Sequence, residues 1–256
     1  MKLSGRTQPL YPHYSILQAL EVIQRLGFDG VEICLETDEL APSRLTPGLV
    51  SSIRDLTISL SLNPHVVGYH KDYIYDDEEF IQTQEAIKLV PAFGANILIF
   101  SGATKRSGSE EEWLRMVART QDLVWLAEDS GVVLAQEFEP GFIVGSTSDL
   151  LKLFEEIPSE NLVANLDLGH VFLCDPEPLE SIRQLGSKII HGHVENMARG
   201  IHNHLLPQEG DIDLQSYLIE LASVGFDGAL ALDLYRYDYE AIAPETIAFL
   251  RSIWPG

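Results

Sequence analysis

The sequence predicts an α/β fold, a closed (β/α)8 TIM barrel formed by a single domain over residues 1–256. Short β-branched or apolar runs alternate with longer amphipathic segments along the whole chain, which is typical of repeated βα units. Glycine directly follows several of the amphipathic segments, as at Leu26-Gly27 and Val224-Gly225, where it can cap a helix in the left-handed conformation. No linker or change in composition interrupts the alternation, so closure into one barrel is favoured over an open sheet.

The elements can be placed from these patterns. We expect strands at residues 31–35, 57–62, 96–100, 132–138, 162–166, 188–193 and 229–234, with a weaker first strand near residues 1–6. We expect helices at residues 15–26, 47–56, 77–93, 110–130, 148–156, 178–185, 213–224 and 239–253. The sequence Gly-Phe-Asp-Gly occurs at 27–30 and again at 225–228, each time between a helix and a strand, which supports a repeated unit. No Gly-rich phosphate-binding motif follows the first strand, which argues against a dinucleotide-binding fold and a P-loop.

Composition narrows the classes of partner. The chain has 17 basic and 39 acidic residues and a formal net charge of −22, which would repel a phosphate backbone and an anionic membrane surface. No apolar run is long enough to span a bilayer, and the first residues do not have the pattern of a leader peptide. The two cysteines, Cys34 and Cys174, predict neither a disulfide framework nor a thiolate metal site. We therefore expect a cytoplasmic protein with no nucleic-acid or membrane partner, and we leave its oligomeric state open, a homo-oligomer included.

Polar side chains gather where the later strands end. The strand from residue 132 leads to Glu137 and Glu139, the next ends at Asp167, the next carries His193, and the last ends at Asp233. In a barrel of this type the active site is built at the carboxyl ends of the strands, so these side chains should meet. Buried carboxylates without a partner are costly, and a cation would neutralise them. The mainly oxygen ligand set suits one divalent ion, Mn2+, Mg2+, Co2+ or Zn2+, and does not choose among them.

Four sequence segments carry a resemblance to a known family. They are LAQEFEPG at 134–141, NLDLGH at 165–170, IHGH at 190–193 and EGDIDL at 209–214. In this order and spacing the chain resembles the xylose isomerase-like superfamily of sugar isomerases and epimerases. That superfamily includes D-tagatose 3-epimerases, inosose dehydratases, hydroxypyruvate isomerases and the endonuclease IV branch. The resemblance extends over nearly the whole chain, from residue 27 to the strand at Asp233.

The resemblance implies a ligand set for the metal, formed by Glu137, Asp167, His193 and Asp233. One position departs from the family pattern, because the family usually has glutamate where this chain has Asp233. Aspartate is one methylene shorter, which puts in doubt the role of this carboxylate as a base, although it could still bind the metal. The alternative is that these strand-end carboxylates have a purely structural role, in which they would cap helices or pair with arginines.

A second group of residues is implied to face the substrate, and it consists of His170, Arg199, His202 and His204, with Glu139 as a further candidate. In the endonuclease IV branch, the positions that match the three histidines hold an additional zinc ion. That branch also has histidines at the ends of strands three and four, where we place Asn63 and Ser101 in this chain. We therefore expect no complete trinuclear zinc site.

Two enzyme functions remain open at this point. The first is a metal-dependent isomerase or epimerase that acts on a sugar or a polyol ketone through an enediolate. In it Glu137 is the base, Asp233 returns the proton, and His170 and Arg199 orient the hydroxyls and the carbonyl. The second is a lyase or dehydratase of the inosose dehydratase type, in which one of the histidines protonates a leaving group. A non-catalytic sugar-binding barrel and an abasic-site endonuclease are weaker alternatives.

Overall fold

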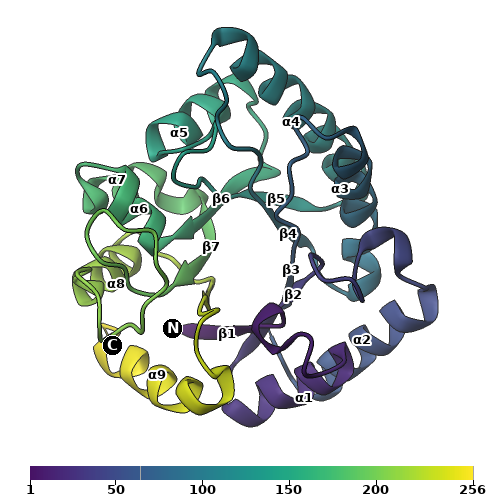
Figure 1. Cartoon of the computed structure of the whole chain (residues 1–256), viewed down its shortest axis with the longest axis vertical. Helices are drawn as coiled ribbons and strands as arrows, with labels where there is room; N and C mark the ends of the chain where they lie inside the picture. The colour runs from purple at the N-terminus through teal and green to yellow at the C-terminus, as the bar shows by residue number, and fades with distance from the viewer. Residues whose placement is uncertain (64, 256) are drawn as a thin grey trace.

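Eight parallel strands close into a barrel in the computed structural model of the chain, which describes residues 1–63 and 65–255. Each strand pairs with its neighbours in sequence, and β8 pairs with β1 to complete the ring. Figure 1 shows the strands labelled β1 to β7 around the centre of the barrel. The strands are β1 (Lys2–Arg6), β2 (Gly30–Cys34), β3 (His65–Gly68), β4 (Ile97–Phe100), β5 (Val133–Gln136), β6 (Leu162–Asp167), β7 (Ile189–Val194) and β8 (Ala229–Leu232). The predicted fold class is therefore confirmed.

The helices form the outer layer around this barrel (Figure 1). Within the described residues they are α1 (Ile16–Leu26), α2 (Pro47–Ser59), α3 (Asp77–Leu89), α4 (Glu110–Ser130), α5 (Thr147–Glu156), α6 (Leu168–Cys174), α7 (Pro178–Leu185), α8 (Leu214–Ser223) and α9 (Tyr239–Ile253). Side chains of Ser, Thr and Asp cap several N-termini: Asp76, for example, accepts hydrogen bonds from the backbone of Glu78 and Glu79 at the start of α3. None of the described helices combines the length and apolar character needed to cross a bilayer.

The apolar core has two parts. The larger part lies between the strands and the surrounding helices, and includes Leu20 and Ile23 of α1 and Leu123 of α4. A separate small cluster joins Val66, Ile99, Ala135 and Val163, which come from β3 to β6 and of which the last three are in direct register. Each residue of this second cluster precedes the carboxyl end of its strand, so the strand ends are left to polar side chains.

The expected strand at residues 57–62 is wrong, because this segment forms the end of α2 and the turn that follows it. The third strand is β3, and Asn63 precedes it instead of following its carboxyl end. The sequence Thr-Ile-Ser-Leu-Ser-Leu alternates like a strand, but Val50, Ile53 and Thr57 also recur at helical spacing and are the buried residues of α2. The hydroxyl of Thr57 donates to the carbonyl of Ile53, which continues the helix. The short helix α6 was not predicted.

Candidate active site

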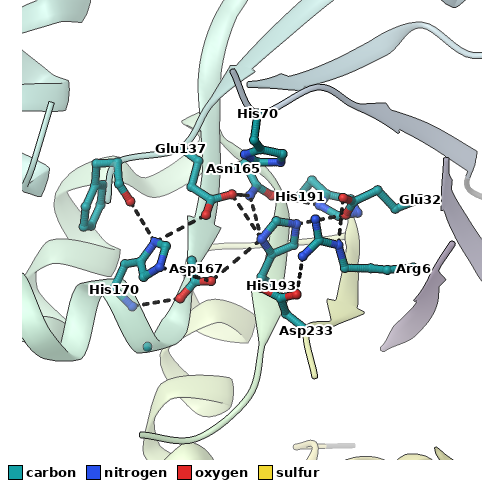
Figure 2. A network of polar contacts seen from close by, with 12 residues as sticks. Arg6, Glu32, His70, Glu137, Asn165, Asp167, His170, His191, His193 and Asp233 are labelled. Atoms are coloured by element: carbon teal, nitrogen blue, oxygen red, sulfur yellow. Dashed lines mark hydrogen bonds and ion pairs between the residues drawn. The ribbon is translucent and has the colours of Figure 1, made fainter. Parts of the chain in front are cut away.

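The four side chains expected to bind a metal converge at the carboxyl end of the barrel (Figure 2). Glu137 directly follows β5, Asp167 ends β6, His193 lies near the end of β7, and Asp233 directly follows β8. His193 Nδ1 is 3.0 Å from Glu137 Oε2 and 3.7 Å from Asp167 Oδ2. Single ligand atoms of Asp167, His193 and Asp233 also lie within 4.8 Å of one another. All four residues are buried.

Glu32 of β2 fixes the orientation of the His193 imidazole. His193 Nε2 lies 2.9 Å from Glu32 Oε2, and a carboxylate can only accept there, so Nε2 carries a proton. Burial would lower the pKa of His193, but Glu137 and Glu32 raise it well above its ordinary value, so without a metal Nδ1 also carries a proton. Nδ1 faces Glu137 and Asp167, and a bound cation would take the place of its proton. A carboxylate that holds the second nitrogen of a histidine is the usual support of an imidazole ligand. Burial opposes the charge on Glu32, but Arg6 and His193 hold the pKa of this carboxyl well below its ordinary value.

The donor set fits a divalent cation. Asp167 Oδ1 accepts a hydrogen bond from the backbone N–H of His170 and caps α6, whereas Asp167 Oδ2 is buried and has no hydrogen-bond partner among the described residues. Burial alone would raise the pKa of Glu137, but His193, with smaller contributions from His70 and His170, lowers it to about 2. Two ionised carboxylates and the Nδ1 atom of His193, which would give up its proton to a metal, therefore face one locus, and such a set of ligand atoms suits Mn2+, Mg2+, Co2+ or Zn2+.

Asp233 has a partner that sequence reasoning missed. The guanidinium of Arg6, at the end of β1, forms a short ion pair with Asp233 Oδ1 and a second ion pair with Glu32 Oε1 at 2.9 Å. Arg6 is only 2% exposed and also donates to the hydroxyl of Tyr235. The shorter aspartate is thus bridged by Arg6 to the carboxylate that supports His193. The strand-end rule applied to the first strand would have found Arg6, since it is the last residue of β1.

These residues open into a cavity of about 730 Å3 at the mouth of the barrel. Of the expected substrate-facing residues, Glu139, His170, His202 and His204 line it, together with Arg6. The imidazoles of His170 and His202 approach to 3.1 Å between their Nε2 atoms, and His204 Nδ1 lies 3.5 Å from Asp233 Oδ2.

Arg199 is placed outside this lining. Its side chain is exposed and its guanidinium lies over the ring of Phe172, 5.2 Å from the centroid. Its backbone N–H donates to Asp211, so the loop that carries it is tied to the segment before α8. The spacing of this residue after β7 could not show the direction in which the loop turns.

The corrected third strand brings one further histidine to the site. His70 lies just beyond β3, lines the cavity, and groups with Glu137 and His193 as a set of candidate ligand atoms. Its backbone N–H donates to Glu36 Oε1 at 2.7 Å, which fixes the start of the loop. The position after strand three is therefore occupied by histidine, in place of the Asn63 expected from the sequence. Ser101, directly after β4, does line the cavity as its predicted place at a strand end implies.

Asn165 and His191 hold the Glu137 carboxylate in place through two successive hydrogen bonds. The amide of Asn165 donates to Glu137 Oε2 at 2.6 Å, and its oxygen lies 2.8 Å from His191 Nδ1. All three side chains are buried, and burial is the main cause that lowers the pKa of His191 to about 3. A neutral His191 donates from Nδ1 and keeps the Asn165 amide pointed at the carboxylate. The sequence indicated His191 only as a residue on the same strand face as His193.

Curated relatives of the chain include sugar-transforming enzymes. A fructoselysine 3-epimerase of Escherichia coli O157:H7 is 21% identical over 259 residues, which cover 94% of each chain. An inosose isomerase of Bacillus velezensis is 24% identical over 264 residues, which cover 96% of this chain and 93% of the relative. A Methanocaldococcus jannaschii protein is 31% identical over 117 residues, so the chain spans 40% of that relative. The relatives that match along their full length support an enzyme of the isomerase and epimerase type.

Solved structures repeat the same fold. The D-psicose 3-epimerase of Clostridium cellulolyticum, solved with D-tagatose, superposes with a TM-score of 0.84 at 15% identity and full coverage of both chains. The IOLI protein, solved with a zinc atom, superposes with a TM-score of 0.80 at 20% identity, over 99% of this chain and 96% of that one. Residues 20–253 match the model of the xylose isomerase-like TIM barrel, and the chain therefore belongs to this family.

Proposed function

We propose that the chain is a divalent-metal-dependent isomerase or epimerase of a ketose or a related polyol ketone. The observation that carries the proposal is the convergence of Glu137 Oε2, the unpartnered Asp167 Oδ2 and His193 Nδ1 beside a cavity that Glu137 and His193 line. The names of the fructoselysine 3-epimerase and the D-psicose 3-epimerase support the same chemistry. A divalent ion held by these groups and Asp233 would act as a Lewis acid toward the substrate carbonyl and the developing enediolate.

Glu137 is the proposed base that removes the proton next to the carbonyl. Its pKa of about 2 keeps it ionised at neutral pH, and Asn165 holds its Oε2 in place. Asp233, which comes from β8 across the mouth of the barrel, would return a proton on the opposite face of the planar intermediate. Return on the other face inverts the carbon, which is epimerisation, and return to the neighbouring carbon gives an isomer.

Arg6 and His170 are the proposed orienting groups. Arg6 lines the cavity and carries a permanent charge, so it can hold a substrate oxygen where Arg199 was expected to do so. His170 is fixed by the Phe138 carbonyl, which lies 2.9 Å from its Nδ1, and its Nε2 faces His202. Burial would lower the pKa of His170, but Asp167 and Glu137 raise it, so it can donate to a substrate hydroxyl.

The experiment is a product analysis of ketoses incubated with the Mn2+-loaded protein in deuterated water. Reversible proton removal puts deuterium on the carbon next to the carbonyl and forms an epimer or an isomer. Glu137→Gln should abolish both results because the amide cannot accept the proton. Equal deuterium incorporation by wild type and Glu137→Gln would refute the role of this carboxylate.

A dehydratase is the second candidate, and the chain of imidazoles favours it. The rings of three histidines, His170, His202 and His204, follow one another along one wall of the cavity. The His202 centroid lies 4.9 Å from that of His170 and 5.3 Å from that of His204. One of them could protonate a hydroxyl that leaves from the β-carbon of the same enediolate. Incubation with keto-inositols separates the two candidates, because elimination gives an unsaturated ketone that absorbs in the ultraviolet and epimerisation does not.

A further inference from the structure

We propose that the cavity recognises an anionic group on the substrate, a phosphate or a carboxylate, through Lys71 and Arg106. This inference rests on the proposed function, since it concerns the end of the substrate that is remote from the reacting carbons. Both side chains line the same cavity as Glu137 and His193. A ligand that reaches the metal locus can therefore reach these two cations without leaving the cavity.

The order of the barrel places the two cations across the mouth from Asp233. Lys71 lies in the loop after β3 and Arg106 in the loop after β4, whereas Asp233 directly follows β8. In a closed ring of eight strands, β8 is nearly opposite β4. A ketose bound between Glu137 and Asp233 would point its far end toward the loops after β3 and β4.

The Arg106 guanidinium is held in place before any ligand binds. It stacks on the ring of Tyr75, 3.5 Å from the centroid, and the Tyr75 hydroxyl forms a short hydrogen bond to Glu112. The same Glu112 carboxylate accepts hydrogen bonds from the backbone of Arg106 at 2.7 Å and of Gly108 at 2.6 Å. An arginine that is stacked and carried on a fixed loop loses little entropy when it binds an oxyanion.

The two cations are largely uncommitted to neighbouring acids. Lys71 takes part in none of the ion pairs found within residues 1–63 and 65–255. Arg106 has one long contact, with Nη2 3.5 Å from Asp72 Oδ2, while Asp72 Oδ1 accepts from the backbone of Ile74 and Tyr75. Glu36, another acid that lines the cavity, accepts a hydrogen bond from the His70 backbone through Oε1.

The charge of the whole chain gives this pair its significance. A protein with a net charge of −22 repels an anionic ligand over most of its surface. Lys71 and Arg106 bring positive charge to one wall of the substrate cavity and can form charge-assisted hydrogen bonds with oxyanions. The same cavity is also lined by acidic residues, namely Glu36, Asp72, Glu137, Glu139 and Asp233. A neutral sugar would gain little from the two cations, so the placement indicates a charged substrate.

The test is a comparison of affinities for ketoses that differ only at carbon 6. Binding of the D-2-ketohexoses, their 6-phosphates and the matching 6-carboxylates to Mn2+-loaded protein is measured by calorimetry. We expect the wild type to bind one charged series at least about tenfold more tightly than the neutral sugars. The double variant Lys71→Met, Arg106→Met should lose that preference, so that the ratio of the charged to the neutral dissociation constant approaches one.

Lys105→Met is the control, because it removes one positive charge from the loop that carries Arg106, and Lys105 does not line the cavity. It should keep the preference of the wild type, and equal metal content and melting temperature will show that each variant is folded. A preference for phosphate or for carboxylate identifies the anion. If the wild type binds or converts neutral ketoses as well as the charged ones, the inference is wrong and the proposed function is unaffected. Absence of binding by every series overturns the inference, and the deuterium experiment then judges the proposed function separately.

Discussion

Arg6 connects two buried carboxylates, those of Glu32 and Asp233. All three side chains are almost fully buried. Removal of one partner from a buried ion pair leaves the remaining charges desolvated, which costs more than the pair itself contributes. Arg6 therefore has a structural role in addition to its place in the cavity.

Arg6→Met should lower the free energy of unfolding of the metal-free protein by about 3 kcal/mol. The loss should be smaller with Mn2+ present, because the metal would neutralise part of the carboxylate charge that the substitution leaves unpaired. Urea denaturation in EDTA and in Mn2+ measures both values. Arg25→Met is the control: it removes a surface ion pair with Glu240 and should cost less than about 1 kcal/mol. Equal costs for the two variants would contradict the role assigned to Arg6.

Glu32 contacts two residues that reach the metal locus: His193 directly, and Arg6, which pairs with Asp233. Glu32→Gln would keep the size of the side chain and remove the charge that polarises the imidazole, so metal affinity should fall about tenfold or more. Competition with a fluorescent chelator gives the dissociation constant for Zn2+ or Mn2+. Glu85→Gln, which changes an exposed residue on α3, should bind metal like the wild type. An unchanged affinity in Glu32→Gln would show that His193 needs no carboxylate behind it.

At the scale of the element, α4 contributes more than a packed face to the barrel. Its first-turn residue Glu112 folds back and receives hydrogen bonds from Tyr75 and from the loop at Arg106 to Gly108. The Tyr75 hydroxyl and these backbone N–H groups lower the pKa of Glu112 to about 2. This helix start thereby fixes the loop that follows β4.

Glu112→Gln should therefore destabilise the protein in a pH-dependent way. The folded-state pKa of Glu112 lies below the value of about 4.5 expected in the unfolded chain, so its stabilising contribution is fully present above pH 4.5. That contribution is lost as the pH falls toward 2, so the difference in melting temperature between wild type and variant should shrink over this range. Calorimetric melts between pH 7 and about pH 3 measure the difference. A difference that stays constant with pH would mean that the charge of Glu112 is not what holds the loop.

The sequence allowed most elements to be predicted, and the failure at residues 57–62 has a physical cause. Ile58, Leu60 and Leu62 satisfy a period of two, and Val50, Ile53 and Thr57 satisfy a helical period, so the pattern alone could not decide. Burial of the second set in α2 decided it in the folded chain. The error moved the end of strand three and concealed His70, because a histidine is recognised as a site residue only when its strand end is placed correctly.

The candidate site was predictable where one rule applied and unpredictable where contacts cross the barrel. Glu137, Asp167, His193 and Asp233 were found because strand ends share one edge of the sheet. Glu32 lies inside a buried strand, and its role follows from a contact with His193, 161 positions away in sequence. Arg199 shows the converse, since a loop residue at suitable spacing can still turn toward Phe172 and solvent.

At the scale of the whole molecule, the carboxylates gathered at the carboxyl end of the barrel should make the free energy of unfolding depend on divalent ions. A ligand that binds only the folded state stabilises it by about 2.7 kcal/mol at a concentration one hundred times its dissociation constant. Mn2+ or Zn2+ should therefore raise the unfolding free energy of the wild type by about that amount under those conditions. The double variant Glu137→Gln, His193→Gln should gain far less. Equal gains in both proteins would place the bound ion elsewhere on the acidic surface.

The pairing of β1 with β8 has a consequence for synthesis of the chain on the ribosome. β1 cannot form its second strand pair until residues 229–232 have left the exit tunnel, because its partner in that pair is β8. During this interval the nascent sheet is an open arc, and both of its rims offer unsatisfied main-chain donors and acceptors to other polypeptides. A message truncated before β8 would thus yield a product prone to intermolecular strand exchange and rapid clearance, even with nine-tenths of its sequence intact.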